Sequence, residues 1–149
     1  MSRLDVADFL GDLADRWQAM VETRGLTLEL DLPDEGVIQG DPMLLARLFD
    51  NLLDNACRYT QPGGRIWLAA RAAPPGWQLS VANTGAGIPT EWRERVFQRF
   101  GRGDPSRTRD TGGAGLGLAL CQAIAQLHGG ALRLEETTRE ITRFTVDLP

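Results

Sequence analysis

The spacing of apolar side chains along this chain predicts three long amphipathic helices. Apolar residues recur at helical spacing in three segments, residues 5–24, 42–59 and 115–128. Asp41 followed by Pro42 gives the second segment a strong start, since aspartate caps a helix and proline suits its first turn. Glycines follow the first and third segments, as they commonly do at helix ends. A shorter helix is predicted from Thr90 to roughly Phe97.

Alternation of apolar and polar residues predicts the strands. Five segments show it: residues 27–33, 65–71, 77–82, 131–136 and 142–148. Val37 and Ile38 could form a further short strand, and the connection 74–76 is short enough for an antiparallel hairpin. Helices and a mixed, mostly antiparallel sheet of about five strands in this order predict an α/β two-layer sandwich, with about three helices on one face.

Composition places the chain among soluble, single-domain globular proteins. It has 149 residues, of which 42% are hydrophobic and 24% charged, so residues 1–149 are expected to form one domain. The net charge is −4 and the basic residues are spread along the chain, which argues against a nucleic-acid surface. All sixteen basic residues are arginine, which excludes a Schiff-base lysine and the lysine of a Walker A loop.

The two cysteines give no sign of a metal site or a disulfide. Cys57 and Cys121 lie within apolar helical patterns and lack metal-ligand spacing, so we expect buried, reduced thiols in a cytosolic domain. The uncharged stretch 111–132 holds too many glycines and polar side chains to span a membrane. The N-terminus shows no signal peptide.

Two asparagines share one face of the second predicted helix. Asn51 and Asn55 are four residues apart, and Arg58 follows three residues later. Asparagine suits a helix interior poorly, because its side chain competes with the backbone. Two of them in a leucine-rich helix favour a ligand over the alternative, a solvated face. An amide oxygen is also a suitable ligand for Mg²⁺, which is commonly held by few protein oxygens together with phosphates.

A glycine-rich segment, residues 112–118, immediately precedes the third helix. Glycines let backbone N–H groups approach an anion, and a helix N-terminus adds a favourable field. This favours phosphate binding, with a flexible hinge as the alternative. The preceding loop, residues 99–114, carries arginines that could reach phosphate oxygens or could equally be solvated, namely Arg99, Arg102, Arg107 and Arg109. A loop of this length in a compact domain is usually functional or disordered.

A third motif, VANTGAGIP at residues 81–89, has two glycines directly after an apolar strand. Its order with NLLDNACRYT before it, and with VFQRF and GGAGLGL after it, resembles the N, G1, F and G2 boxes of bacterial sensor histidine kinases. The resemblance is to their ATP-binding domain, which has the Bergerat fold of the GHKL superfamily. It covers residues 5–149, and four spaced motifs in the right order leave chance little room.

The resemblance implies a role for each matching position. Asn55 matches the Mg²⁺ ligand, whereas Asn51 and Arg102 match residues that position the phosphates during catalysis. Arg58 and Tyr59 match positions on the phosphate and nucleoside side. The G1 positions, expected to shape the adenine pocket, are Asn83, Gly85, Gly87 and Ile88. The G2 positions, expected to hold the phosphates and anchor a mobile ATP lid, are Gly113, Gly115, Leu116, Gly117 and Leu118. Gly101 stands where many relatives have an aromatic residue.

Asn83 departs from the family pattern. The family ordinarily has an aspartate there, which accepts a hydrogen bond from the adenine amine. Asparagine keeps one acceptor oxygen but loses the charge assistance, so we expect ATP binding weakened by roughly 1–2 kcal/mol. A degenerate nucleotide-binding or scaffolding pseudokinase is therefore the alternative to a kinase.

The chemistry implied by the resemblance is transfer of the ATP γ-phosphate to a histidine on a separate dimerisation domain, then to an aspartate of a response regulator. Hydrolytic relatives carry a glutamate at the position of Asn51, so efficient hydrolysis is not expected here. The single histidine, His128, lies at a helix end and is expected to be a capping residue. We expect an isolated, monomeric, cytoplasmic catalytic domain that binds ATP and Mg²⁺ but cannot phosphorylate itself, and whose parent kinase is anchored in the bacterial inner membrane.

Overall fold

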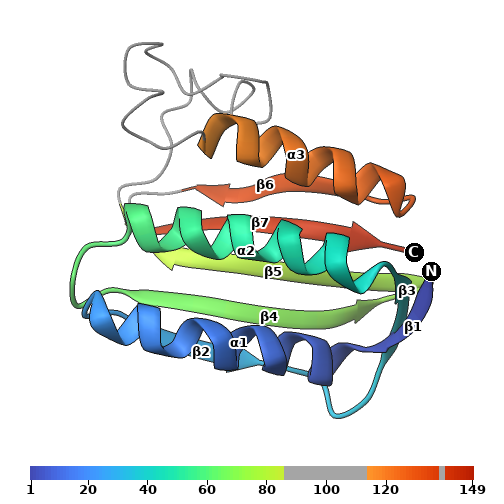
Figure 1. Ribbon diagram of the computed structural model, residues 1–149, viewed down its shortest axis with the longest axis horizontal. Coiled ribbons are helices and arrows are strands. Elements are labelled where there is room, and N and C mark those ends of the chain that lie inside the picture. The colour runs from blue at the N-terminus through green and yellow to red at the C-terminus, as the bar shows by residue number, and fades with distance from the viewer. Residues whose placement is uncertain (86–113, 138–139) are drawn as a thin grey trace.

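Three helices cover one face of a five-stranded sheet (Figure 1). The computed structural model describes residues 1–85, 114–137 and 140–149. The helices are α1 (Val6–Thr23), α2 (Pro42–Tyr59) and α3 (Ala114–Leu127). The strands are β1 (Ser2–Asp5), β2 (Thr27–Asp31), β3 (Val37–Gly40), β4 (Arg65–Ala73), β5 (Gly76–Thr84), β6 (Ala131–Thr137) and β7 (Ile141–Leu148).

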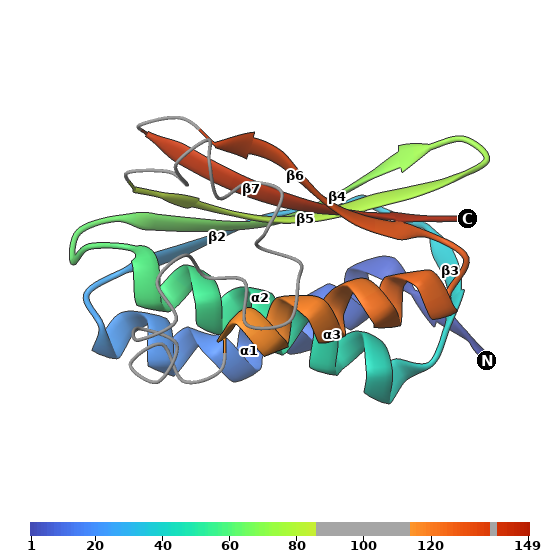
Figure 2. The same cartoon turned by 90° about the horizontal axis from the view of Figure 1, so that it is seen from above.

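The sheet has the order β2-β4-β5-β7-β6. Strands β2 and β4 pair in parallel, and the other three pairs are antiparallel. Seen from above, the helices form one layer and the sheet the other (Figure 2). The predicted fold class, a two-layer α/β sandwich with a mostly antiparallel sheet of five strands and three helices on one face, is confirmed.

Helix α2 lies between α1 and α3 and supplies much of the core (Figure 1). Its predicted start is confirmed, because the Asp41 carboxylate accepts hydrogen bonds from the Met43 and Leu44 amides at 2.9 and 3.1 Å. Burying each large side chain of such a helix contributes about 1.5–3 kcal/mol. The buried residues of α2 are Leu45, Leu48, Phe49, Leu52, Leu53, Ala56 and Cys57.

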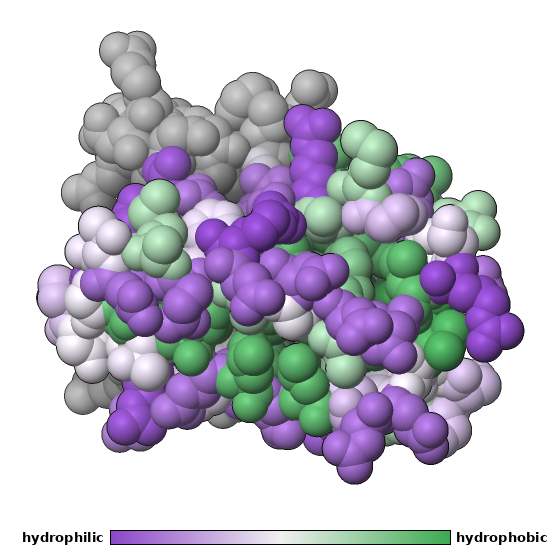
Figure 3. Space-filling model, turned by 60° about the horizontal axis from the view of Figure 1, so that its bottom comes forward, coloured by the Kyte–Doolittle hydropathy of each residue, from purple (hydrophilic) through white to green (hydrophobic). Residues whose placement is uncertain are grey.

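Both cysteines are buried and free, as the sequence predicts for structural thiols. Burial raises the pKa of the Cys121 thiol to about 12 and also raises that of Cys57. None of the helices in the described ranges combines the length and the apolar character needed to cross a membrane. Hydrophilic side chains cover much of the face in Figure 3, with apolar groups among them.

The structure differs from the predicted elements in two places. Strand β1 was not expected from the sequence; it pairs antiparallel with β3, outside the main sheet. Strand β5 continues to Thr84, so Asn83 lies within a strand and not in the turn after it. Both differences reflect pairing with distant strands, which a four-residue or terminal segment does not reveal by itself. The predicted helix at 90–97 and most of the arginine-rich loop lie outside the described residues.

Candidate functional site

The predicted site residues come together at one end of the helix layer. The last turns of α2, the end of β5 and the first turn of α3 all lie on the left side in Figure 1. Helices α2 and α3 pack directly on each other there, although more than fifty residues separate them in sequence. Of the predicted positions, Gly87, Ile88, Arg102 and Gly113 lie outside the described residues.

Asn51 faces the first turn of α3. Its amide Nδ2 donates to the carbonyl oxygen of Arg47 at 3.0 Å, one helical turn earlier. A Cβ placed on Gly117 would lie 3.1 Å from Asn51 Oδ1, so the two helices approach this closely only because residue 117 is glycine. The amide oxygen of Asn51 thus lies against Gly117, and its nitrogen is bound to the Arg47 carbonyl.

Asn55, Arg58 and Tyr59 continue along α2 from Asn51. The Arg58 Nε donates to Asp54 Oδ2 at 3.0 Å, an ion pair one turn apart that orients the guanidinium along the helix. Tyr59 is 43% exposed, which leaves its ring accessible at the helix end. These residues therefore lie in the second half of α2 together with Asn51.

Asn83 lies on the helix-covered face of the sheet, at the end of β5. It continues the inward-facing row of Leu79 and Val81, and it is only 5% exposed. Its Nδ2 donates to the carbonyl oxygen of Thr84 at 3.0 Å. The opposite amide orientation would set two acceptors against each other, so this bond fixes which atom is the nitrogen. The Oδ1 atom accepts no hydrogen bond from the described residues.

The chain after Asn83 is anchored to two other segments. The Gly85 amide donates to the Glu140 carbonyl at 3.1 Å, and a Cβ on Gly85 would lie 3.1 Å from the Tyr59 carbonyl oxygen. The end of α2, the end of β5 and the start of β7 therefore meet at this glycine. A side chain larger than glycine would separate Tyr59 from the strand end.

A close-packed junction beneath the site was not predicted from the sequence. The Thr84 hydroxyl accepts from the Arg65 amide at 3.0 Å, and the Thr60 hydroxyl donates to the Ala56 carbonyl at 2.6 Å. A side chain on Gly64 would collide with both threonines. The glycine pair after α2 was the available signal, but it indicated only a turn.

The first turn of α3 also lies at this end. Gly115, Leu116 and Gly117 lie in that turn, where the N–H groups of an α-helix have no intrahelical acceptor. Such a turn favours an anion. Leu118 is 4% exposed and belongs to the core, so its side chain anchors the helix to the sheet.

The described residues do not form a metal site by themselves. No group of three or more histidine, cysteine, aspartate or glutamate side chains within residues 1–85, 114–137 and 140–149 could hold a metal ion. Asn55 offers a single amide oxygen, which suits a metal that brings most of its ligands with it. Mg²⁺ bound to phosphates is of this kind.

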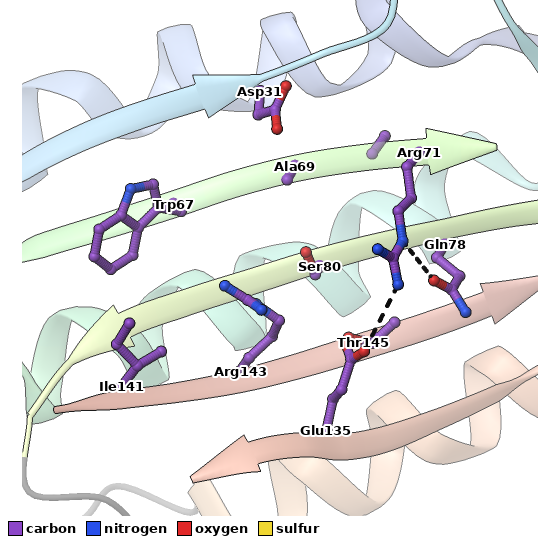
Figure 4. Close-up of a pocket in the computed structure, with 11 residues that line it drawn as sticks. Asp31, Trp67, Ala69, Arg71, Gln78, Ser80, Glu135, Ile141, Arg143 and Thr145 are labelled. Atoms are coloured by element: carbon purple, nitrogen blue, oxygen red, sulfur yellow. Dashed lines mark hydrogen bonds and ion pairs between the residues drawn. The ribbon is translucent and has the colours of Figure 1, made fainter. Parts of the chain in front are cut away.

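A separate hollow of about 330 Å³ lies on the opposite face of the sheet (Figure 4). Ala69 and Ser80, both small, lie at its floor, and larger side chains surround them. Arg71 donates to Gln78 Oε1 at 2.8 Å and lies 3.9 Å from Glu135 Oε1. These three groups therefore pair with one another on the face of the sheet away from Asn83.

Comparison with known proteins identifies the family. Residues 40–149 match the family described as histidine kinase-, DNA gyrase B-, and HSP90-like ATPase. The sensor histidine kinase CusS of Escherichia coli O157:H7 is 40% identical over 146 residues, which cover 98% of this chain and 30% of CusS. The chain thus spans less than a third of the length of this relative.

Solved structures agree with the fold. The ATP binding domain of PrrB from Mycobacterium tuberculosis is 28% identical, with a TM-score of 0.77 and coverage of 99% of this chain and 96% of PrrB. Histidine kinase ThkA, solved in complex with the response regulator TrrA, shares the fold at a TM-score of 0.80 and 19% identity, over 99% of this chain and 42% of ThkA. The chain belongs to the histidine kinase-, DNA gyrase B-, and HSP90-like ATPase family.

Proposed function

We propose that this chain is the Mg·ATP-binding catalytic domain of a two-component sensor histidine kinase. It would donate the ATP γ-phosphate to a histidine on a separate dimerisation domain, from which the phosphate passes to an aspartate of a response regulator. The observation that carries this proposal is the approach of Asn51 to Gly117. It joins an amide oxygen of α2 to the donor-rich first turn of α3, at the end where Asn83 also lies.

Asn83 supplies the contact that selects adenine. Since its nitrogen is bound to the Thr84 carbonyl, Oδ1, which accepts nothing from the residues that the structure describes, is the atom that would accept from the adenine amine. Gly85 allows the backbone to come close beside it, and Gly87 with Ile88 would complete the pocket. This arrangement supports adenine binding through one neutral hydrogen bond, where the family ordinarily uses a carboxylate.

The phosphates would lie between α2 and the first turn of α3. Backbone N–H groups of Gly115 and Gly117 would donate to phosphate oxygens, and Asn51 would keep the helices at the right separation. Arg58, Tyr59 and Arg102 would contact the nucleotide from the outside. Catalysis of phosphoryl transfer then rests on positioning and on charge neutralisation, as in other phosphotransferases.

Asn55 would hold the magnesium ion together with phosphate oxygens. A hard cation bound in this way neutralises the charge of the transferred group. The donor set fits Mg²⁺, because the described residues offer an amide oxygen and no cluster that would hold a metal without nucleotide. We infer that Mg²⁺ binds with ATP and not before it.

Transfer to a histidine is favoured over hydrolysis of ATP. A hydrolase needs a base that activates the attacking water, and the residue best placed beside the phosphates, Asn51, cannot take up a proton. His128, the single histidine of the chain, is 7% exposed and both of its ring nitrogens are engaged. The nucleophile and its base would therefore come from another domain.

A second candidate function is a scaffolding pseudokinase. The observation that favours it is Asn83, because a neutral acceptor binds adenine more weakly than a carboxylate does. Such a module would contact a partner kinase without transferring phosphate. It would still bind nucleotide weakly or would bind none.

The proposed partners follow from the proposed reaction. They are the dimerisation and phosphoacceptor domain of the same kinase and a response regulator, the kind of protein with which ThkA was solved in complex. We propose a cytoplasmic location for this domain, in a kinase anchored in the inner membrane. The domain by itself would be monomeric.

Radiolabelled ATP separates these possibilities. The chain alone should acquire no acid-labile label, whereas adding the phosphoacceptor domain of the same kinase should produce label on that domain. A thermal-shift titration with ADP and ATP, with and without Mg²⁺, gives the matching binding measurement. Binding without transfer would favour the pseudokinase, and label on the chain alone would contradict both candidates.

A further inference from the structure

The far end of α3 is fixed to the start of α2 by a histidine that the proposed site does not use. His128 directly follows the last residue of α3 and is 7% exposed. Its Nε2 accepts from the Asp41 amide at 3.0 Å, and its Nδ1 lies 2.8 Å from the Ile124 carbonyl oxygen. Because the Asp41 N–H can only donate, Nε2 carries no proton and Nδ1–H donates to Ile124.

The segment before α2 is shaped to receive this ring. A Cβ on Gly40 would lie 3.3 Å from His128 Cδ2 and 3.4 Å from Nε2, so glycine lets the imidazole reach the backbone. The Asp41 side chain caps α2, while its backbone N–H binds the histidine. One residue therefore starts α2 and receives the end of α3.

His128 belongs to a row of three contacts between the two helices. Gly117 lies against Asn51, the Cys121 thiol donates to the Leu48 carbonyl at 3.4 Å, and His128 binds Asp41. The row runs along one face of each helix in opposite directions, and it spans about 16 Å at the rise of an α-helix. The phosphate-side contact is at one end, and the histidine is at the other.

The three contacts differ in how well they resist sliding of α3 along α2. A glycine against an amide limits only how closely the helices approach, and a thiol is a weak donor. The imidazole bond to Asp41 is a hydrogen bond of normal length, 3.0 Å, from a backbone N–H to a buried ring, and such bonds are directional. Gln122 exchanges two hydrogen bonds with the Leu132 backbone, but this ties α3 to β6 and not to α2.

We propose that His128 is a positioning residue for nucleotide binding. Through the Asp41 amide it sets the position of α3 along α2, and so the position of the phosphate-binding turn relative to Asn51. This inference rests on the proposed function for its nucleotide readout. Since Gln122 and the apolar core still hold α3 to the sheet, variants at position 128 should fold.

Two amide substitutions separate the two bonds of the imidazole. In His128→Gln the side-chain oxygen can reach the place of Nε2 and accept from Asp41. In His128→Asn the amide nitrogen can replace Nδ1–H, but no atom reaches Asp41. Leu10→Val, a mild core change in α1, is the control for lost stability.

Calorimetry with ADP and Mg²⁺ should divide these variants. His128→Asn is expected to weaken ADP binding about fivefold, and His128→Gln to stay within about twofold of the unchanged chain, because only the first loses the Asp41 bond. Leu10→Val should bind like the unchanged chain although its melting temperature falls. Equal losses in both histidine variants, or no loss in either, would overturn the proposal.

Hydrogen exchange without nucleotide provides the second readout. The Asp41 amide and the amides of residues 117–121 should exchange faster in His128→Asn than in His128→Gln. If the unchanged chain binds no ADP, the proposed function fails, and this exchange pattern still decides the role of His128. Identical exchange in the two variants would refute it.

Discussion

Polar side chains on the outer face of the central sheet and on its helix side differ in their hydrogen-bond partners. On the outer face they pair with one another across strands: Arg133 binds Asp147 at 2.7 Å, and Arg71 reaches both Gln78 and Glu135 (Figure 4). On the helix side, the nitrogens of Asn51 in α2 and Asn83 at the end of β5 donate to nearby backbone carbonyls. Their oxygens accept no hydrogen bond from the described residues.

This difference separates polar groups that support the fold from polar groups that serve a ligand. An outer-face charge with an opposite neighbour has little left to offer a partner. An amide whose nitrogen is held by the backbone is pre-oriented, and its oxygen can accept from a ligand at little entropic cost. Changes on the helix side should therefore alter nucleotide affinity, and changes on the outer face should alter only stability.

The largest effect is expected from Gly117→Val. A Cβ at this position already lies 3.1 Å from Asn51 Oδ1, and the two methyl groups of valine would force α2 and α3 apart. We expect ADP affinity measured by calorimetry to fall about a hundredfold, as small displacements of positioned groups do. The control is Gly11→Ala in α1, where no atom lies within 4 Å of the added Cβ. Equal affinities in the two variants would contradict the close approach of the helices.

Gly64→Ala should lower stability by about 2 kcal/mol, because its added carbon collides with Thr60 and Thr84 in the junction beneath the site. Urea unfolding followed by fluorescence measures the change. Gly11→Ala is again the control. The neighbouring Gly63 is not used, because its φ of +90° would strain an alanine whatever the packing. A Gly64→Ala protein as stable as the unchanged chain would show that the junction is loosely packed.

The smallest effect is expected on the outer face. On this face, the hydrogen bond from Arg133 holds the pKa of Asp147 below its usual value. The carboxylate therefore contributes stability above its ordinary pKa, and this contribution disappears as the pH falls through the lowered one. Because these groups are partly exposed and screened, Arg133→Ala should cost only about 0.5 kcal/mol near neutral pH, and nothing once Asp147 and Glu135, the other partner of Arg133, are both protonated. The ADP affinity of Arg133→Ala should be unchanged. A loss of affinity in this variant would show that the outer face also affects nucleotide binding.

The sequence was most informative where signals are local. Asp41-Pro42 and the glycines after Tyr59 gave the bounds of α2, and the four-residue spacing placed Asn51 and Asn55 on one face. It could not show that Asn83 lies inside a strand or that its nitrogen binds Thr84, because strand length depends on distant partners. The His128–Asp41 bond joins residues 87 positions apart, and only tertiary packing reveals it.

Calorimetry of ADP with Mg²⁺ on three variants tests the central claim that the Asn83 oxygen serves the nucleotide. Asn83→Ala should bind ADP about tenfold more weakly, because it loses the acceptor oxygen. Asn83→Asp should bind about fivefold more tightly, because a charged acceptor strengthens the hydrogen bond from adenine. This gain is expected to exceed the cost of placing the second carboxylate oxygen opposite the Thr84 carbonyl. Gln78→Glu, the same amide-to-acid change on the outer face of the same strand, should leave affinity unchanged. Failure of the unchanged chain to bind nucleotide at millimolar concentration, or equal affinities across the Asn83 variants, would contradict the claim.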